Sequence, residues 1–110
     1  MAWEIKNKNL SKRLHELGLV EDEMGYWFYP PYSTAFWIIS SYYDSISMVG
    51  GFNYDRDRII DLGLSTKYNV EDENFIITQV KKLIDEFQNC MFLYKQDQEQ
   101  KRLEKLKQDF

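Results

Sequence analysis

The sequence predicts an α+β fold in which a small antiparallel sheet of about three to four strands is packed by a short N-terminal helix and a long C-terminal helix. The sheet is predicted by an aromatic stretch over residues 26–43, whose side chains favour strands. The helices are predicted by leucines at helical spacing over residues 10–17 and by a longer apolar periodicity after Asn69. With 110 residues, the chain is expected to form a single domain over residues 1–110.

The short helix is expected over residues 10–17. Three leucines recur at spacings of four and three residues and share one apolar face: Leu10, Leu14 and Leu17. Either Asn9 or Ser11 can cap the beginning of this helix, because each side chain offers an oxygen to the unpaired N–H groups there. Gly18 suits the left-handed backbone position that commonly follows a helix end.

The aromatic stretch predicts two strands that meet at Pro30-Pro31, since proline interrupts strand pairing. In the second strand, the alternation of side chains places Trp37 and Ile39 on one face. Phe36 and Ile38 lie on the other. Both faces are apolar. We therefore expect this strand at the centre of the sheet, with cover on both sides and with Trp37 buried.

Two further elements are expected between the aromatic stretch and the long helix. Residues 46–49 predict a third strand, which a hairpin turn at Asp44-Ser45 joins to the second. Residues 54–64 predict a short helix, because a polar beginning is followed by an apolar end and then by a glycine. A strand over residues 58–62 is the competing interpretation of the same segment.

The long helix is expected to begin at Asn69, a good cap, and the acidic residues 71–73 suit the positive end of the helix dipole. No glycine or proline interrupts the chain from Asn69 to Phe110, so the helix should run long. Its first part, over residues 70–94, is expected to cover the sheet with apolar side chains that recur every three or four residues: Ile76, Val80, Leu83, Phe87, Cys90 or Met91, and Tyr94.

Residues 95–110 differ in character from the first part of the long helix. Charged side chains of both signs are mixed there, which is typical of a solvated helix. Leu103, Leu106 and Phe110 share one face. Such an extension either stays solvated or packs on a partner, and a second copy of the chain would give a homodimer.

The charge balance argues against a nucleic-acid partner. The net charge is −4, whereas domains that grip a phosphate backbone usually carry a basic stripe. No lysine or arginine accompanies the aromatic side chains between Met24 and Met48. No apolar run approaches the length of a transmembrane helix, so we expect no membrane contact. A single cysteine cannot form a disulfide within the chain, which favours a cytoplasmic location.

Few residues offer catalytic or metal-binding chemistry. His15 is the only histidine and Cys90 the only cysteine, so a catalytic pair and a zinc site both lack their components. We interpret His15 as a helix residue near solvent and Cys90 as a small buried apolar side chain. Asp55, Asp57 and Asp61 could place carboxylate oxygens near one another, and Asp55-x-Asp57 begins like a calcium loop. The remaining ligand positions of such a loop, including its final glutamate, are missing, so helix capping is the favoured interpretation. We expect no enzymatic activity, no cofactor and no metal.

One segment resembles a known group of proteins. Its pattern is Leu10-Ser11-x-x-Leu14-x-x-Leu17-Gly18, followed by Tyr26-Trp27. The pattern is similar to that of small uncharacterised proteins encoded by phages and prophages, in which a short helix ends at Leu-Gly and a strand carries an aromatic pair. The resemblance covers residues 10–27. It implies a bacterial host cell as the setting and carries no activity with it.

These observations favour a non-enzymatic accessory protein of the phage or prophage type that acts by protein–protein contact. The candidate contact residues belong to the aromatic stretch and to the C-terminal extension: Tyr29, Tyr32, Tyr42, Tyr43, Leu103, Leu106 and Phe110. The alternative is an acidic inhibitor that occupies a nucleic-acid-binding site on a host enzyme, because acidic residues cluster at 21–23, 55–61 and 71–73.

Overall fold

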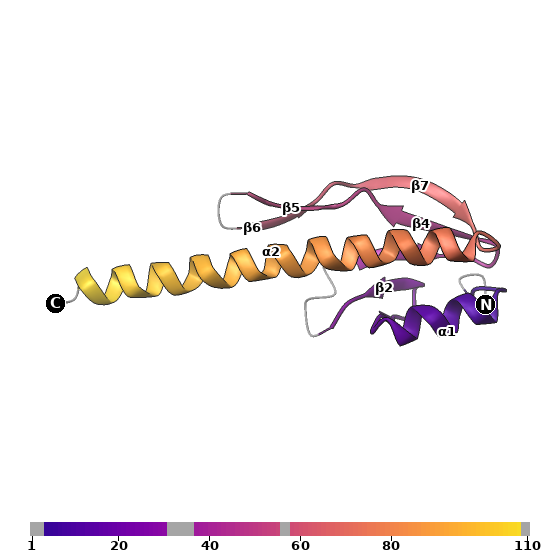
Figure 1. Cartoon of the computed structure of the whole chain (residues 1–110), viewed down its shortest axis with the longest axis horizontal. Coiled ribbons are helices and arrows are strands. Elements are labelled where there is room, and N and C mark those ends of the chain that lie inside the picture. The colour runs from indigo at the N-terminus through magenta and orange to yellow at the C-terminus, as the bar shows by residue number, and fades with distance from the viewer. Residues whose placement is uncertain (1–3, 31–36, 56–57, 109–110) are drawn as a thin grey trace.

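The computed structural model describes residues 4–30, 37–55 and 58–108, and within them the chain is an α+β protein (Figure 1). Helix α1 (Lys8–Glu16) lies near the N-terminus and helix α2 (Glu73–Gln108) ends the described chain. Between them the main sheet has five antiparallel strands in the order β1-β2-β3-β4-β7, and β5 and β6 pair separately. The predicted fold class is confirmed, but the main sheet has more strands than the three to four expected.

Helix α1 begins earlier than the leucine pattern predicted. Its cap is Asn7, whose side-chain oxygen accepts a hydrogen bond from the Leu10 N–H at 3.1 Å. The prediction of Asn9 or Ser11 was wrong, because the cap lies a full turn before the first leucine that faces the core. The end of the helix is as predicted: Gly18 has φ +98°, and its N–H donates to the His15 carbonyl at 2.9 Å.

The first four strands follow one another across the sheet. They are β1 (Val20–Glu21), β2 (Tyr26–Phe28), β3 (Trp37–Ser41) and β4 (Ser45–Val49). Strand β3 lies at the centre, and both Ile38 and Ile39 are fully buried, so both faces of this strand are covered as expected. The turn at Asp44 joins β3 to β4 as a hairpin, which confirms that prediction.

The buried tryptophan is Trp27 and not Trp37. Trp27 is 0% exposed and lies beneath α1, where its ring meets that of His15 at 4.8 Å between centroids. Trp37 begins β3, is only half-buried, and lies 5.0 Å from the ring of the exposed Tyr26. The expectation that Trp37 is buried was therefore wrong, because α1 covers the sheet over β2 rather than over the first residue of β3.

The helix predicted over residues 54–64 is wrong. Strands β5 (Phe52–Asp55) and β6 (Arg58–Asp61) form a hairpin there, so the competing interpretation of a strand at 58–62 was closer. Strand β7 (Leu64–Asn69), which the sequence did not predict, continues from β6 and pairs with β4. The chain bends at Gly50 and Gly63, between the β4–β7 pair and the β5–β6 hairpin. The Gly50 N–H donates to the Gly63 carbonyl, and Gly63 has φ +77°.

Helix α2 begins at Glu73, so the prediction that Asn69 caps it was wrong: Asn69 ends β7, and its side chain organises the turn before the helix. The Asn69 side-chain oxygen accepts from the Glu71 N–H at 2.8 Å, and the Asp72 carbonyl accepts the first helical bond, from Ile76, at 3.0 Å. The helix then runs without interruption for 36 residues, as expected. The buried residues of α2 include five of the predicted stripe: Ile76, Val80, Leu83, Phe87 and Cys90. Ile77 and Ile84 are buried as well, whereas the prediction for Tyr94 was wrong: it is 37% exposed, near the end of the covered part of the helix.

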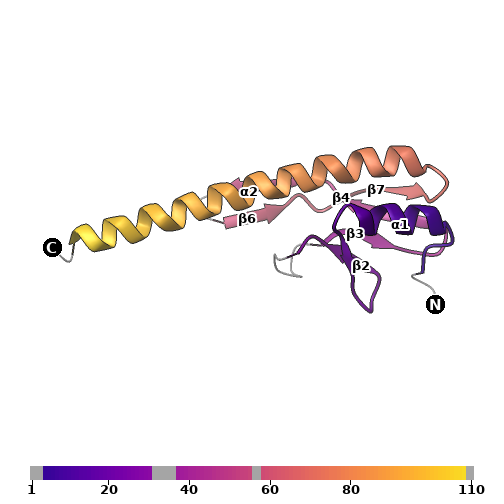
Figure 2. The same ribbon diagram turned by 60° about the horizontal axis from the view of Figure 1, so that its bottom comes forward.

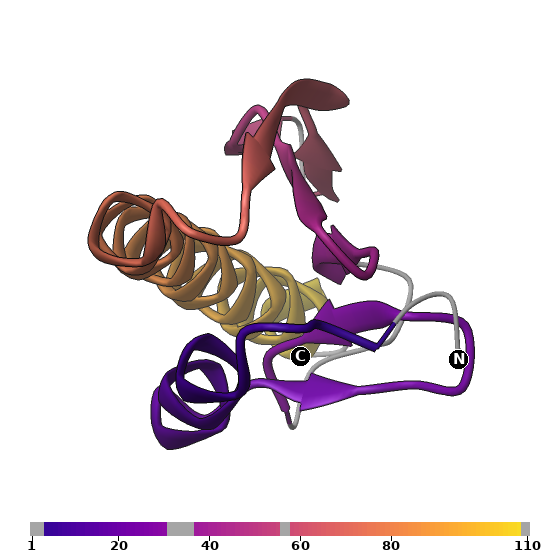
Figure 3. The same cartoon turned by 90° about the vertical axis from the view of Figure 1, so that its right-hand side faces the viewer.

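The molecule is elongated, with extents of 60 × 22 × 20 Å. The strands and α1 gather around the first two thirds of α2, and the rest of the helix projects beyond them (Figure 2). Figure 3 looks along the long axis and shows β4 and β7 on one side of α2 and α1 on another. The β5–β6 hairpin extends the covered part of α2: the Phe52 and Phe87 rings lie 4.9 Å apart, and the Tyr54 hydroxyl donates to the Asp97 carboxylate at 2.6 Å.

Candidate functional site

The predicted contact residues in the aromatic stretch do not form one surface. Tyr29 is half-buried within the body of the protein, where its hydroxyl accepts a hydrogen bond from the Gln88 amide at 3.2 Å. Tyr42 and Tyr43 lie at the β3–β4 turn and are 44% and 60% exposed, with the Lys67 ammonium 4.8 Å from the centre of the Tyr42 ring. Tyr32 lies outside the described residues.

The predicted contact residues in the C-terminal extension are exposed and lie at the other end of the molecule. Leu103 is 59% exposed and Leu106 is 46% exposed, while Phe110 lies outside the described residues. A helix rises about 1.5 Å per residue, so Leu103 is about 45 Å along α2 from Glu73, beside which the β3–β4 turn lies. The tyrosines of the turn and the leucines of the extension are therefore two separate surfaces.

Phe92 belongs with the two leucines, although it was not among the predicted contact residues. This side chain is 59% exposed, although it follows directly after residues of the predicted core stripe. At about 100° per residue, Phe92 and Leu103 lie about 140° and 160° around the helix from the buried Phe87. We call Phe92, Leu103 and Leu106 the distal stripe. The helical spacing of eleven residues between Phe92 and Leu103 is a signal that the sequence contains.

On the side of α2 that faces the core, the side chains change from apolar to polar where the β5–β6 hairpin ends. Asp97 accepts the bond from Tyr54, and Lys101 and Lys105 follow on the same side of the helix. The described strands and α1 contact α2 on its core side, before this change. The distal stripe therefore does not continue the core of its own chain.

A hollow lies between the main sheet and α2. It has a volume of about 240 Å³ and is lined by residues of β4, β7 and α2: Met48, Val49, Gly50, Tyr68, Gln79, Lys82, Leu83 and Glu86. Met48, Val49 and Leu83 contribute buried apolar side chains to its lining, and the exposed Lys82 and Glu86 contribute charged ones. The volume is below the roughly 300–1,000 Å³ typical of small-molecule sites.

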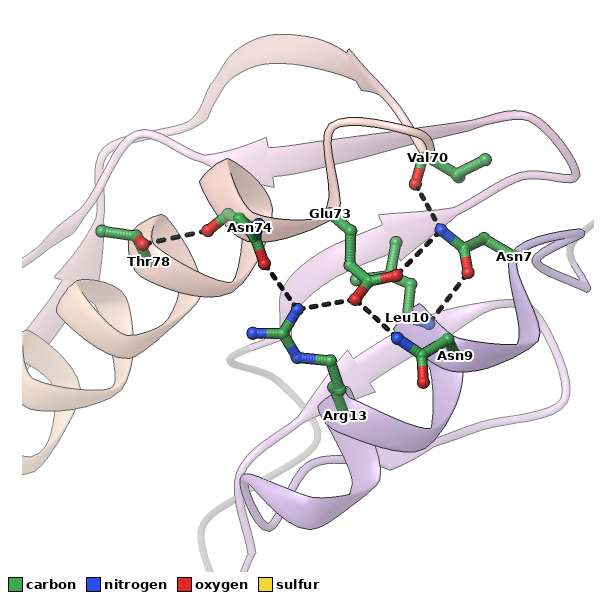
Figure 4. Close-up of polar contacts among 8 residues, drawn as sticks. All are labelled: Asn7, Asn9, Leu10, Arg13, Val70, Glu73, Asn74 and Thr78. Atoms are coloured by element: carbon green, nitrogen blue, oxygen red, sulfur yellow. Dashed lines mark hydrogen bonds and ion pairs between the residues drawn. The ribbon is translucent and has the colours of Figure 1, made fainter.

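A polar cluster fastens α1 to the beginning of α2 (Figure 4). The Glu73 carboxylate accepts hydrogen bonds from Arg13 at 2.6 Å, Asn9 at 2.7 Å and Asn7 at 3.2 Å. Arg13 also donates to the Asn74 side chain at 2.9 Å. The hydrogen bond from Arg13 lowers the pKa of Glu73 below its usual value, against a smaller opposing effect of burial. Each of these groups already has a partner within the chain, so the cluster is a structural clamp.

The residues considered for chemistry lie apart from one another. His15 is exposed on α1, with Nδ1 2.9 Å from the Ser11 carbonyl oxygen and Nε2 3.8 Å from Glu21. Cys90 is buried as predicted, and burial together with the negative charge of Glu86 raises the pKa of its thiol. A raised pKa keeps this thiol protonated at neutral pH.

The aspartates of the β5–β6 hairpin do not cap a helix, and that interpretation was wrong. Asp55 pairs with Arg58 at one end of the hairpin, whereas Asp61 pairs with Phe52 at the other. Asp61 accepts a hydrogen bond from the Gly63 N–H at 3.1 Å and so caps a turn. Asp57 lies outside the described residues. Across residues 4–30, 37–55 and 58–108, no three His, Cys, Asp or Glu side chains are placed to hold a metal ion.

Comparison of the chain with protein-family models, with curated proteins and with solved structures gave no match. Within the described part of the chain, neither helix has an apolar stretch long enough to cross a membrane. The polar groups of the clamp are already paired within the chain, and the hollow is smaller than a typical small-molecule site. The distal stripe is therefore the candidate site that we consider further.

Proposed function

We propose that the protein acts by protein–protein contact, without chemistry of its own, and that the distal stripe is the contact surface. The observation that carries this proposal is the position of Phe92, Leu103 and Leu106, which lie on the side of α2 that faces away from the core. Phe92 lies about 16 Å along α2 from Leu103. A line of apolar side chains spaced along one exposed helix face is typical of helix–helix packing. The resemblance to phage and prophage proteins supports an accessory role in the cytoplasm of a bacterial host.

The energetics of a projecting helix support the same proposal. Residues 98–108 follow Asp97, which accepts a hydrogen bond from Tyr54 of the hairpin, and all of them are exposed. Isolated helices shorter than about 12–15 residues are marginal in water, and most helical stability in proteins comes from packing of an apolar face. A partner on the distal stripe would supply that packing.

Photo-crosslinking tests the proposal directly. A photoreactive phenylalanine analogue replaces Leu103 in one variant and Lys105, on the opposite side of the same turn, in the control. We expect a discrete crosslinked protein adduct from position 103 in bacterial cells, at least five-fold above the yield from position 105. Equal yields from the two positions would mean that the stripe makes no specific contact.

A further inference from the structure

We infer that the distal stripe pairs with the distal stripe of a second copy of this chain, with the two α2 helices antiparallel. The inference rests on the proposed function, because it names the partner of the same surface. The spacing of the stripe is the first reason. Its line of residues along α2 advances by four and three in turn: Phe92, Gln96, Glu99, Leu103 and Leu106. This is the spacing with which two helices pack along a shared seam.

The charge of Glu99 decides the orientation. In a parallel pair, each seam residue faces its own counterpart, so two Glu99 carboxylates would meet in the middle of the seam. In the antiparallel register that places Phe92 against Leu103 of the second copy, Glu99 instead faces Gln96, whose amide can donate to the carboxylate. Two-fold symmetry repeats both contacts, so a Phe92–Leu103 layer lies on each side of two central Gln–Glu layers, and Leu106 lies outside them, opposite Asn89 of the second copy.

The charged side chains on either side of the seam are also mostly compatible with this antiparallel register. Lys107 lies beside Glu86 of the second copy, and both side chains are exposed in the single chain. Lys95 lies beside Arg102 of the second copy, which is a like-charged pair at the solvent edge, where it is screened. A parallel pair would place Arg102 beside Lys107 in addition to the Glu99 repulsion in the seam.

The shape of the molecule leaves room for this pairing. The strands contact α2 on the side of Phe87 and Asp97, and the distal stripe points away from them. Two antiparallel copies would therefore carry their sheets on the outer sides and at opposite ends of the assembly (Figure 1). With so few apolar layers, we expect a weak dimer, with a dissociation constant on the order of 10–100 μM.

Sedimentation equilibrium of the full chain between 5 μM and 1 mM tests whether a second copy of the chain binds the distal stripe. We expect the wild type and Lys105→Glu to reach the mass of a dimer within this range, and Leu103→Glu to remain monomeric. Circular dichroism of each variant at 5 μM checks that the monomer is folded. A wild type that is monomeric at 1 mM, or a Leu103→Glu variant that dimerises like the wild type, would overturn the inference.

Crosslinking between two single-cysteine chains tests the orientation. In a Cys90→Ala background, Phe92→Cys and Leu103→Cys chains carrying different tags are mixed and treated with a short thiol–thiol crosslinker. An antiparallel pair gives mainly the mixed 92–103 product, at least five-fold above either homodimer, whereas a parallel pair gives the homodimers and overturns the inference. Statistical yields like those of Lys105→Cys would overturn it as well.

The two proposals fail separately. A monomeric chain whose position 103 still crosslinks to a different protein would remove the second copy as the partner and leave the contact function standing. A monomeric chain without a specific adduct at position 103 would remove both.

Discussion

Trp27 has its polar end satisfied inside the protein. Its Nε1–H donates to the Ser41 hydroxyl at 3.0 Å, and that hydroxyl donates to the Gly25 carbonyl at 3.2 Å. Trp27 and Ser41 are 0% and 1% exposed, so water does not replace these bonds. A buried N–H without an acceptor costs the free energy of its desolvation. The Ser41 hydroxyl is therefore the acceptor that keeps the buried indole N–H of Trp27 paired.

Ser41→Ala is expected to lower the free energy of unfolding by about 1–3 kcal/mol, because it leaves the indole N–H of Trp27 unpaired. Ser47→Ala is the matched control: this serine lies on the neighbouring strand β4, and its effect should stay within about 0.5 kcal/mol. Urea denaturation followed by tryptophan fluorescence measures both. Equal effects of the two substitutions would contradict this account of Ser41.

The two tryptophans of the sheet should differ in their contribution to stability. Trp27→Ala is expected to cost about 3–5 kcal/mol, as for other fully buried large side chains. Trp37→Ala should cost about 1–2 kcal/mol, because the half-buried ring loses less apolar contact area. Thermal and urea denaturation of both variants decides the order. A larger loss at Trp37 would restore the prediction made from the sequence.

At the scale of elements, the Glu73 clamp links the first helix to the last. Glu73→Gln should lower the melting midpoint at pH 7, because Arg13 and two asparagines lose a carboxylate acceptor. Glu71→Gln is the control, since Glu71 is exposed in the turn before α2. Differential scanning calorimetry at neutral pH compares the two variants, and equal midpoints would argue against the clamp.

The clamp also predicts a pH dependence. The folded-state pKa of Glu73 is lowered from its usual value of 4.5, so ionised Glu73 stabilises the fold above pH 4.5. This stabilisation is lost as the pH falls through the lowered folded-state pKa. The difference in melting midpoint between wild type and Glu73→Gln should therefore shrink between pH 4.5 and pH 2. A difference that stays constant over that range would contradict the assignment.

The β5–β6 hairpin is held to α2 at its far end by Tyr54. Tyr54→Phe removes the bond to Asp97, and about 1 kcal/mol of lost local stability corresponds to roughly five-fold faster opening of the hairpin. Amide hydrogen exchange should speed up in β5 and β6 while β3 and β4 keep their protection. Tyr43→Phe, at an exposed position, should leave both unchanged. Uniform acceleration across the sheet would show that the hairpin does not open independently.

At the scale of the whole molecule, the folded body ends where the hairpin meets α2. A chain that ends at Gln98 keeps the buried residues of α2 and the Asp97 carboxylate. At 5 μM, where the proposed dimer is dissociated, its melting midpoint should match that of the full chain within about 2 °C. A chain that ends at Gln96 should melt earlier, since it lacks Asp97. A large loss in the chain ending at Gln98 would mean that the distal helix stabilises its own monomer.

The parts of the protein that the sequence predicted correctly depend on neighbours close in the chain. Leu10 and Leu14 repeat at helical spacing, Gly18 provides the left-handed end of α1, and the uninterrupted run after Asn69 forms one long helix. Leu103 and Leu106 share a face for the same local reason. Each of these features follows from a few residues and from helix geometry, so no other part of the chain is needed to predict it.

Tertiary structure decided the rest, because the deciding contacts join residues far apart in the sequence. Residues 54–64 have a pattern compatible with a helix, or with a strand over 58–62, and the pairing of Gly50 with Gly63 selects the hairpin. Trp27 is buried because α1 lies over it, which the aromatic stretch alone does not specify. Phe92 is exposed because the hairpin occupies the opposite side of α2. The sequence by itself determined the helical spacing of the distal stripe, and packing decided which side of the helix faces outward.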